Sequence, residues 1–323
     1  MFDPVGIIVL IVAVAGFGWI TKRAWRVQRL LPRLGGVAIA GVLTLACTAV
    51  LVLALRGYWK LNRGHPNPVP EVSVSPTPER RARGEQLAGM CAGCHTADGE
   101  PPLEGSDFLG EDAPPIGRFY APNLTPTHLS EWSDGEIIRA IREGIHRSGR
   151  SLLLMPSETF RNLNDYDVES VVAFLREQPA VEPDTPDPHL NVLGAVLVNF
   201  APIFTAQPPV IGTVTGPEPG ATPEYGRYIA SITCAACHGE DLRGNTQFEV
   251  PSLIGAALTW SEEQFGSFFR TGVKPGGLSV ADSVMPWSQL GELMGAEGIS
   301  AVVLYLGEEF PTRPDSLDNQ LTP

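Results

Sequence analysis

Two long apolar stretches open the chain, and shorter amphipathic segments fill the rest of it. The apolar stretches cover residues 5–20 and 35–55. A helix that crosses a bilayer needs about 20 apolar residues, so the second stretch is long enough and the first is slightly short. Lys22 and Arg23 follow the first stretch, and their long side chains can reach the water interface. The pattern predicts a transmembrane helical hairpin within residues 1–60.

A cleaved signal peptide is the alternative for the first stretch. Such a peptide has basic residues before its apolar run and small residues at a cleavage site after it. Here the basic residues come after the run, and no clear small-residue pattern stands at its end. Because positive charge collects in cytoplasmic loops, the basic loop between the stretches is expected to be cytoplasmic. The remaining chain is then expected on the periplasmic side of a bacterial cytoplasmic membrane.

Proline-rich segments divide the rest of the chain. They predict a linker over residues 61–78, which would act as a stiff spacer above the membrane, and an interdomain segment over residues 181–222. Residues 190–204, within the second segment, are apolar but too short and interrupted to span a bilayer. We expect them to pack on the domains or on a partner. The parts of the chain outside these two segments are predicted to form one domain at residues 79–180, a second domain at residues 223–312, and a tail at residues 313–323.

The two predicted domains repeat one order of sequence blocks. In each predicted domain, two cysteines and a histidine come first, followed by a predicted helix, a Met-Pro pair and an amphipathic helix. Ser133 and Glu136 have the spacing of a capping box at a helix start, and so have Ser261 and Gln264. No run of alternating strands occurs. The sequence therefore predicts an all-α fold, with two copies of one small domain.

Charge is distributed unevenly between the predicted hairpin and the predicted domains. Residues 1–70 carry eight Lys or Arg and one acidic residue, whereas the rest carry 15 basic and 35 acidic residues, a net charge of −20. An acidic body of this kind argues against nucleic acid as a partner. It fits a basic protein partner or a solvated acidic surface equally well.

Each predicted domain carries the motif C-x-x-C-H, for which three interpretations compete. The residues are Cys91, Cys94 and His95 in the first domain, and Cys234, Cys237 and His238 in the second. A disulfide redox motif expects a βαβ context, which the helical pattern does not offer. A zinc site needs four ligands, and two cysteine pairs would leave the histidines unexplained. Covalent haem attachment uses all three residues, so the motifs predict two covalently attached c-type haems, with His95 and His238 as iron ligands.

The second axial ligand of each haem is predicted to be a methionine. Met155 and Met285 occupy the same block of the repeat, and each precedes a proline. Met294 is the alternative to Met285, although helix packing explains it better, and His128 and His146 are alternatives to Met155. A histidine and methionine pair fills the iron and suits electron transfer rather than oxygen binding.

Both domains resemble class I c-type cytochromes in these residues. In that family a proline carbonyl accepts the N–H of the haem-binding histidine, and the resemblance gives this role to Pro122 and Pro251. A glycine of the first helix also meets an aromatic residue of the last helix. The corresponding pairs here are Gly84 with Phe174 and Gly226 with Tyr305.

The stretch from "APNLTP" to "SLLLMP" is similar to the cytochrome subunits of membrane-bound quinoprotein and flavin dehydrogenases. Those subunits often carry three C-x-x-C-H motifs, whereas this chain has two and adds an N-terminal helical hairpin.

The expected function is electron transfer by a membrane-anchored dihaem cytochrome c. Its partners would be redox proteins within a membrane complex, together with membrane lipid. No catalytic residue and no small-molecule substrate of its own are expected. The alternatives are a subunit of a quinol–cytochrome c oxidoreductase, a terminal oxidase, a photosynthetic complex or a periplasmic dehydrogenase. A haem peroxidase is a further alternative, but it would need an open iron, which paired axial methionines argue against.

Overall fold

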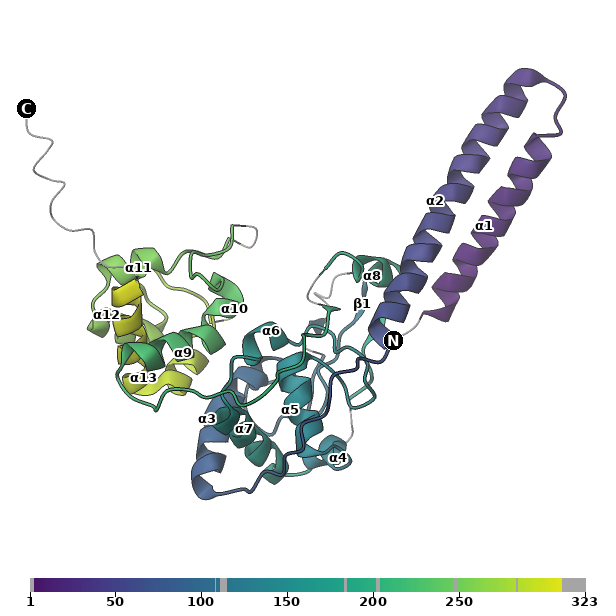
Figure 1. The fold of residues 1–323 in the computed structure, drawn as a ribbon. Coiled ribbons are helices and arrows are strands. Elements are labelled where there is room, and N and C mark those ends of the chain that lie inside the picture. Colours follow the sequence, from purple (N-terminus) through teal and green to yellow (C-terminus); the bar gives the residue numbers. More distant parts are fainter. Residues whose placement is uncertain are drawn as a thin grey trace, which may run out of the picture.

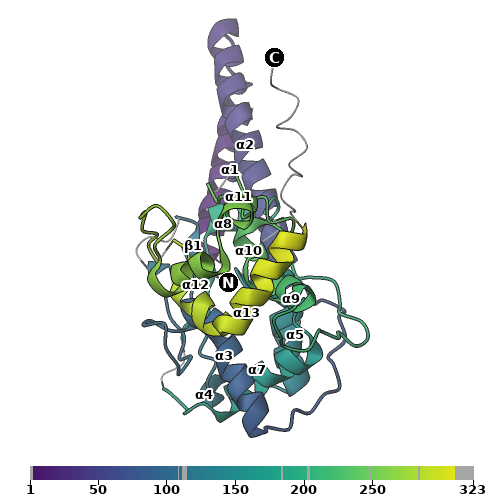
Figure 2. The ribbon, with the colours of Figure 1, turned by 90° about the vertical axis from the view of Figure 1, so that its left-hand side faces the viewer.

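A computed structural model describes residues 3–107, 109–110, 115–182, 185–201, 204–246, 249–282 and 284–309. The predicted tail at residues 313–323 lies outside the described residues. Figure 1 shows a long helical hairpin that leads into two small helical bodies, and Figure 2 shows the same arrangement from the side. The all-α prediction is confirmed, apart from two strands of two residues each.

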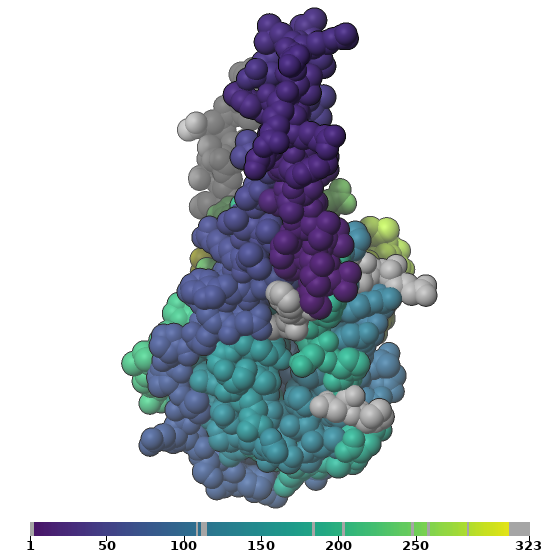
Figure 3. All heavy atoms as spheres, turned by 90° about the vertical axis from the view of Figure 1, so that its right-hand side faces the viewer, coloured from purple at the N-terminus to yellow at the C-terminus, as the bar shows by residue number. Residues whose placement is uncertain are grey.

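The helical hairpin consists of α1 (Pro4–Ala24) and α2 (Leu30–Asn62), packed side by side. Asp3 caps the start of α1, because its side chain accepts the N–H of Gly6 at 2.9 Å. Both helices are long and apolar enough to cross a membrane, and most of their apolar side chains face outward. In the space-filling view the hairpin projects from the globular part as a narrow column (Figure 3). A column of exposed apolar side chains is the arrangement expected of a segment surrounded by lipid.

The first domain is built on two helices that cross closely. Its helices are α3 (Pro78–His95), α4 (Pro126–Leu129), α5 (Asp134–Glu143), α6 (Ser157–Phe160) and α7 (Asp165–Glu177). The α3 and α7 helices pack against each other at Gly84. A Cβ atom at Gly84 would lie 1.9 Å from the carbonyl oxygen of Ser170 and 2.8 Å from Cβ of Phe174. The contact that the resemblance implies between Gly84 and Phe174 is therefore present.

The second domain repeats this arrangement. Its helices are α9 (Pro223–Thr233), α10 (Ala235–His238), α11 (Ile254–Thr259), α12 (Glu262–Thr271) and α13 (Trp287–Glu309). The α9 and α13 helices lie side by side in both ribbon views. A Cβ atom at Gly226 would lie 1.9 Å from the carbonyl oxygen of Ala301 and 2.9 Å from Cβ of Tyr305. Each domain is thus held together by the same kind of close helix crossing.

The α13 helix is a third helix with the length and mean hydropathy of a membrane span. It bends at Gly295, whose φ of 58° is left-handed, and its apolar side chains include the buried Leu293, Val302 and Leu306. These side chains belong to the core of the second domain. Its apolar character is therefore explained by packing within that domain.

Capping predicted from the sequence is confirmed at two equivalent helices. Ser133 and Glu136 form a capping box at the start of α5, and Ser261 and Gln264 form one at the start of α12. Both helices end at a glycine with a left-handed φ, 66° at Gly144 and 67° at Gly272. These stop signals give the two series of helices the same local geometry.

A short antiparallel pair of strands attaches the interdomain segment to the first domain. Strand β1 (Gly117–Arg118) pairs with β2 (His189–Leu190). Helix α8 (Val192–Leu197) follows at once and packs against α2. The expectation that residues 190–204 pack on the domains or on a partner is met at β2, which pairs with the first domain. The sequence does not predict the packing of α8 against the hairpin.

The first proline-rich linker is extended, as expected, but it does not stand free of the first domain. His65 donates its backbone N–H to the carbonyl oxygen of Gly149 at 3.0 Å, and Val74 donates to Asp134 Oδ2 at 2.8 Å. An Asn67 side-chain N–H binds Glu143 Oε2 at 2.7 Å. Extended chain of this kind makes no internal hydrogen bonds, so its polar groups are free to pair with groups of the domain.

The interdomain segment is bound to the same buried carboxylate. Glu143 is almost fully buried, and its Oε1 accepts the N–H of Val210 at 2.8 Å, while its backbone oxygen accepts the N–H of Gln207 at 2.8 Å. Both proline-rich segments therefore meet at Glu143.

Candidate haem sites

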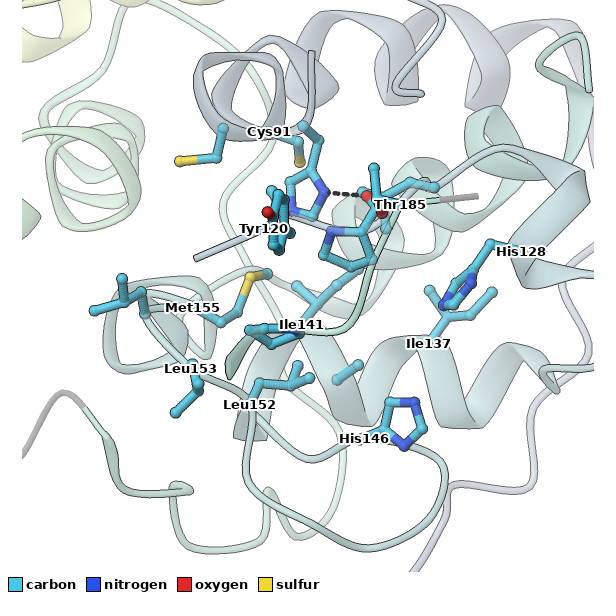
Figure 4. Close-up of a pocket in the computed structure, with 18 of the residues that line it drawn as sticks. Cys91, Tyr120, His128, Ile137, Ile141, His146, Leu152, Leu153, Met155 and Thr185 are labelled. Atoms are coloured by element: carbon cyan, nitrogen blue, oxygen red, sulfur yellow. Dashed lines mark hydrogen bonds between the residues drawn. The ribbon is translucent and has the colours of Figure 1, made fainter. Parts of the chain in front are cut away.

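The cysteines and the histidine of the first motif lie at the C-terminal end of α3. The helical turn brings Cys91, Cys94 and His95 to one wall of a pocket. His95 is buried, and its Nδ1–H donates to the carbonyl oxygen of Pro122 at 2.8 Å, the dashed line in Figure 4. This bond fixes the ring and leaves Nε2 as the nitrogen with a free lone pair.

Burial sets the protonation of these side chains. Burial lowers the pKa of His95 to about 4, against the opposing effect of the Pro122 carbonyl, so the imidazole is neutral. Burial likewise raises the pKa of the Cys91 thiol to about 12, with a smaller contribution from Cys94, and it raises the pKa of Cys94 as well. A neutral imidazole is the form that binds a metal.

The pocket beside the first motif is mainly apolar and has the donor set that a haem needs. Apolar side chains from α4, α5, α6 and α7 line it, namely Leu129, Ile137, Ile141, Phe160, Val171 and Leu175. Met155 reaches into the same space as Cys91 and Tyr120, and His128 and His146 lie away from Met155 (Figure 4). Two thiols, one imidazole and one thioether around an apolar slot fit a covalently bound haem.

The loop that carries Met155 is placed by hydrogen bonds that begin at the end of α5. Leu152 donates its N–H to the carbonyl oxygen of Gly144 at 2.7 Å, and His146 donates to Arg150 at 2.9 Å. Leu154, next to the methionine, has a left-handed φ of 59°. A leucine rarely adopts this conformation, and strain of this kind is common where a side chain must be aimed at a site.

The second domain repeats this placement. Val280 donates to the carbonyl oxygen of Gly272 at 2.8 Å, and Lys274 donates to Leu278 at 2.9 Å, so the loop to Met285 begins in the same way. Trp287 N–H then binds the Met285 carbonyl at 2.7 Å, as Ser157 N–H binds the Met155 carbonyl at 2.8 Å. The two methionines are thus equivalent in local structure as well as in sequence order.

His238 has the same environment as His95. It is buried, and its Nδ1–H donates to the carbonyl oxygen of Pro251 at 2.7 Å. Burial lowers the pKa of His238, although the Pro251 bond opposes this effect. Cys234 is buried beside it and Cys237 is exposed.

The alternative ligands and chemistries fit less well. Met294, a residue of α13, is buried next to Gly298, as expected of a side chain that packs in the domain core. Burial first, and then the charge of Arg150, lower the pKa of His146 to about 4. Within the described residues, no three His, Cys, Asp or Glu side chains gather closely enough to hold a metal ion, so the two cysteine pairs do not meet as a zinc site would require.

Sequence reasoning missed several residues of the first pocket. Tyr120, Arg150, Thr185 and Asp187 line it, and Arg150 Nη2 binds Asp187 Oδ1 at 3.1 Å. Asp187 and Thr185 come from the interdomain segment, which the sequence presents as a linker. No motif marks these residues, because they reach the pocket only through the path that the segment takes over the domain.

Comparison with known proteins identifies both domains. Residues 81–179 match the family model of cytochrome c, and residues 221–306 match that of subunit III of cbb3-type cytochrome c oxidase. The chain is therefore a c-type cytochrome with two cytochrome c domains, a class of protein that binds haem covalently and transfers electrons.

Two curated relatives are dehydrogenase subunits. The chain is 31% identical over 222 residues to a nicotinate dehydrogenase subunit of Pseudomonas putida, a match that covers 59% of the chain and 18% of the relative. It is 24% identical over 180 residues to the fructose dehydrogenase cytochrome subunit of Gluconobacter japonicus, covering 52% of the chain and 35% of the relative. The chain thus spans well under half the length of these relatives.

Proposed function

We propose that this chain is a membrane-anchored dihaem cytochrome that serves as the electron-transfer subunit of a larger oxidoreductase. Cys91 and Cys94 hold the first haem and Cys234 and Cys237 hold the second. His95 with Met155 would bind the iron of the first haem, and His238 with Met285 would bind the iron of the second. The haem supplies one-electron iron chemistry in each domain. The chain itself performs no substrate chemistry, and the dehydrogenase subunits among its relatives support a place beside a substrate-oxidising partner.

The protein's own side chains hold and insulate the cofactor. The carbonyl groups of Pro122 and Pro251 keep each imidazole in one tautomer, with Nε2 available to the iron. The apolar side chains of α5 and α7 would limit the access of water to a haem in the first pocket. A filled, dry site changes little in structure when its charge changes, and this property favours fast electron transfer over ligand binding.

The observation that carries the proposal is the reciprocal packing of the two domains. Gly93, between Cys91 and Cys94, faces Gln289, which lies four residues after Met285 in the sequence, with 3.9 Å between the Gln289 side-chain oxygen and an ideal Cβ at Gly93. On the other side, α10, which carries Cys237 and His238, contacts α6, which begins two residues after Met155. Each haem-attachment turn thus lies beside the methionine segment of the other domain. This arrangement gives electrons a short path between the two sites.

A buried polar network keeps the domains in this arrangement. Asp167 of α7 is held by two Arg83 contacts of 2.7 Å, and it accepts the Tyr228 hydroxyl of the second domain at 2.6 Å. The N–H of Asn164 also binds that hydroxyl at 3.2 Å. Fixed domains keep the distance between redox centres fixed, and electron transfer within the chain depends on that distance.

The first domain is the one beside the membrane in this proposal. Ser151 donates its N–H to the carbonyl oxygen of Leu61 at 3.1 Å, at the end of α2. Leu153 and Leu154 pack against the apolar cluster that includes Leu61. The loop that leads to Met155 therefore packs against the hairpin. The second domain contacts the first domain and so lies farther from the hairpin.

The test is purification of the full chain in mild detergent from its native membranes. We expect intact-mass measurement to give the chain plus two haems, haem staining to survive denaturation, and a substrate dehydrogenase subunit to co-purify and reduce both haems. One covalent haem, or rapid peroxide consumption by the isolated chain, would contradict the proposal. Recovery of the chain from the soluble fraction would contradict the membrane anchoring.

A further inference from the structure

The segment around α8 is an exposed apolar surface that the electron-transfer function does not use. Residues 190–204 contain no charged side chain. Leu193 is 50% exposed, Leu197 is 38% exposed and Phe200 is 70% exposed. An exposed apolar surface of this kind marks a contact with a partner or a membrane.

This surface adjoins the outer face of the hairpin at the end that carries both haem domains. The carbonyl of Ala195 would clash with a Cβ on Gly57 of α2, and the Val192 side chain lies against Gly6 of α1. The Tyr58 hydroxyl donates to the carbonyl oxygen of Leu190 at 3.0 Å. Figure 1 shows α8 beside this end of α2.

The depth of the segment follows from these contacts. The exposed apolar side chains of α1 begin at Val5, so the level of Gly6 is already part of the apolar column. Asn199 reaches one turn farther along α2, because its side-chain N–H donates to the carbonyl oxygen of Leu53 at 2.9 Å. Leu53 is four residues from Gly57, which corresponds to about 6 Å along a helix axis. Phe200 is therefore attached at a level inside the apolar column.

The Asn199 side-chain amide pairs with backbone groups of the protein, and several carbonyls of the segment accept hydrogen bonds from side chains. The Asn199 amide also donates to the carbonyl oxygens of Ala195 and Val196, at 3.3 and 2.9 Å. Lys60 donates from its ammonium group to the carbonyl oxygen of Val198 at 3.0 Å. Backbone carbonyls in lipid must find donors within the protein, and Asn199 and Lys60 supply them to Ala195, Val196 and Val198.

We propose that α8 and the residues that follow it to Ala201 lie in the outer leaflet of the bilayer and contact lipid through Leu193, Leu197 and Phe200. The segment is a third membrane contact that does not span the membrane. It binds the first domain to the bilayer surface at a second point, in addition to α2. This inference rests on the proposed membrane insertion of α1 and α2.

The experiment measures thiol access in the full chain placed in lipid nanodiscs. In a Cys47→Ala background, Phe200→Cys and Leu193→Cys introduce single free thiols, because the motif cysteines of the holoprotein are bonded to haem. Ile211→Cys is the matched control, since Ile211 is 77% exposed and lies in the same interdomain segment. We expect a charged, membrane-impermeant maleimide to label the first two thiols about tenfold more slowly than the control, because thiolate formation and reagent access both require water.

A small uncharged maleimide identifies what covers the two thiols. Lipid admits this reagent but not the charged one, so the proposal expects the ratio of uncharged to charged labelling rates to be about tenfold higher at Phe200→Cys than at Ile211→Cys. Fast labelling by the charged reagent would overturn the proposal, and slow labelling by both reagents with the same ratio of rates as at Ile211→Cys would overturn it in favour of a protein cover. Failure of the chain to enter nanodiscs would instead contradict the membrane anchoring on which the inference rests.

Discussion

The Tyr228 hydroxyl of the second domain donates a 2.6 Å hydrogen bond to Asp167 of the first domain. Asp167 is 2% exposed and is also paired with Arg83, so this bond lies in a buried network that joins α3, α7 and α9. Burial, together with the charge of Asp167, raises the pKa of Tyr228, so the phenol remains a donor throughout the physiological pH range. This contact is one of several that join the two domains.

Tyr228→Phe removes the bond and leaves the packing area nearly unchanged. We expect the free energy of unfolding to fall by about 1.5–3 kcal/mol, since the lost bond is to a charged group. Chemical denaturation followed by circular dichroism measures this change, and slower electron exchange between the haems should accompany it. Tyr166→Phe is the control, because Tyr166 is half exposed. Equal stability of the two variants would show that the domains are held by other contacts.

Met285→His should lower the potential of the second haem and leave the first nearly unchanged. The thioether favours reduced iron, whereas imidazole is a stronger donor that favours oxidised iron. Met155→His should have the converse effect. Spectroelectrochemical titration separates the two potentials, and the weak sulfur-to-iron band of oxidised His/Met haem should fall by half in each variant. Met294→Leu serves as the control; if it abolishes half of that band, Met294 is the ligand.

Replacement of Cys91 and Cys94 by alanine should remove covalent haem from the first domain only. The haem stain on a denaturing gel should fall to about half of the wild-type value, since each domain is expected to hold its own cofactor. Cys47→Ala should leave the stain unchanged, because Cys47 lies within α2. A complete loss of stain in the double variant would mean that the second domain cannot mature alone.

Gly84→Ala and Gly89→Ala form a matched pair on one helix. A Cβ at Gly84 would lie 1.9 Å from the Ser170 carbonyl oxygen, whereas a Cβ at Gly89 meets nothing within 4 Å. We expect Gly84→Ala to destabilise the first domain by about 1–3 kcal/mol through overpacking. Gly89→Ala should stabilise it by roughly 0.5–1 kcal/mol through helix propensity. Thermal unfolding of the two variants measures the difference; a Gly84→Ala variant as stable as Gly89→Ala would mean that α3 and α7 can separate at no cost.

Local signals in the sequence predict the elements and their repeat. The capping boxes at Ser133 and Ser261 act within one helical turn, and the two C-x-x-C-H motifs are themselves single turns, so neither needs knowledge of the rest of the fold. The two cytochrome domains follow from these local features.

Long-range contacts account for what the sequence does not reveal. The pairing of Tyr228 with Asp167 joins residues 61 positions apart, and no periodicity marks a surface tyrosine as a domain contact. The left-handed φ of Leu154 is imposed by the loop around it and contradicts the usual preference of leucine. The binding of both proline-rich segments by Glu143 also depends on a carboxylate that the helical pattern presents as an ordinary polar residue.

The attachment of the first linker to Glu143 restricts how a redox partner meets this protein. A flexible linker as long as residues 64–77 would let a domain wander about 20 Å from its point of attachment. The hydrogen bonds of Asn67 and Val74 hold the linker against the domain and remove that freedom. The first haem pocket therefore has a fixed distance from the hairpin and a fixed orientation relative to it. This attachment argues against a domain that swings between donor and acceptor as a tethered shuttle does. Each partner must bring its own redox centre to a stationary relay.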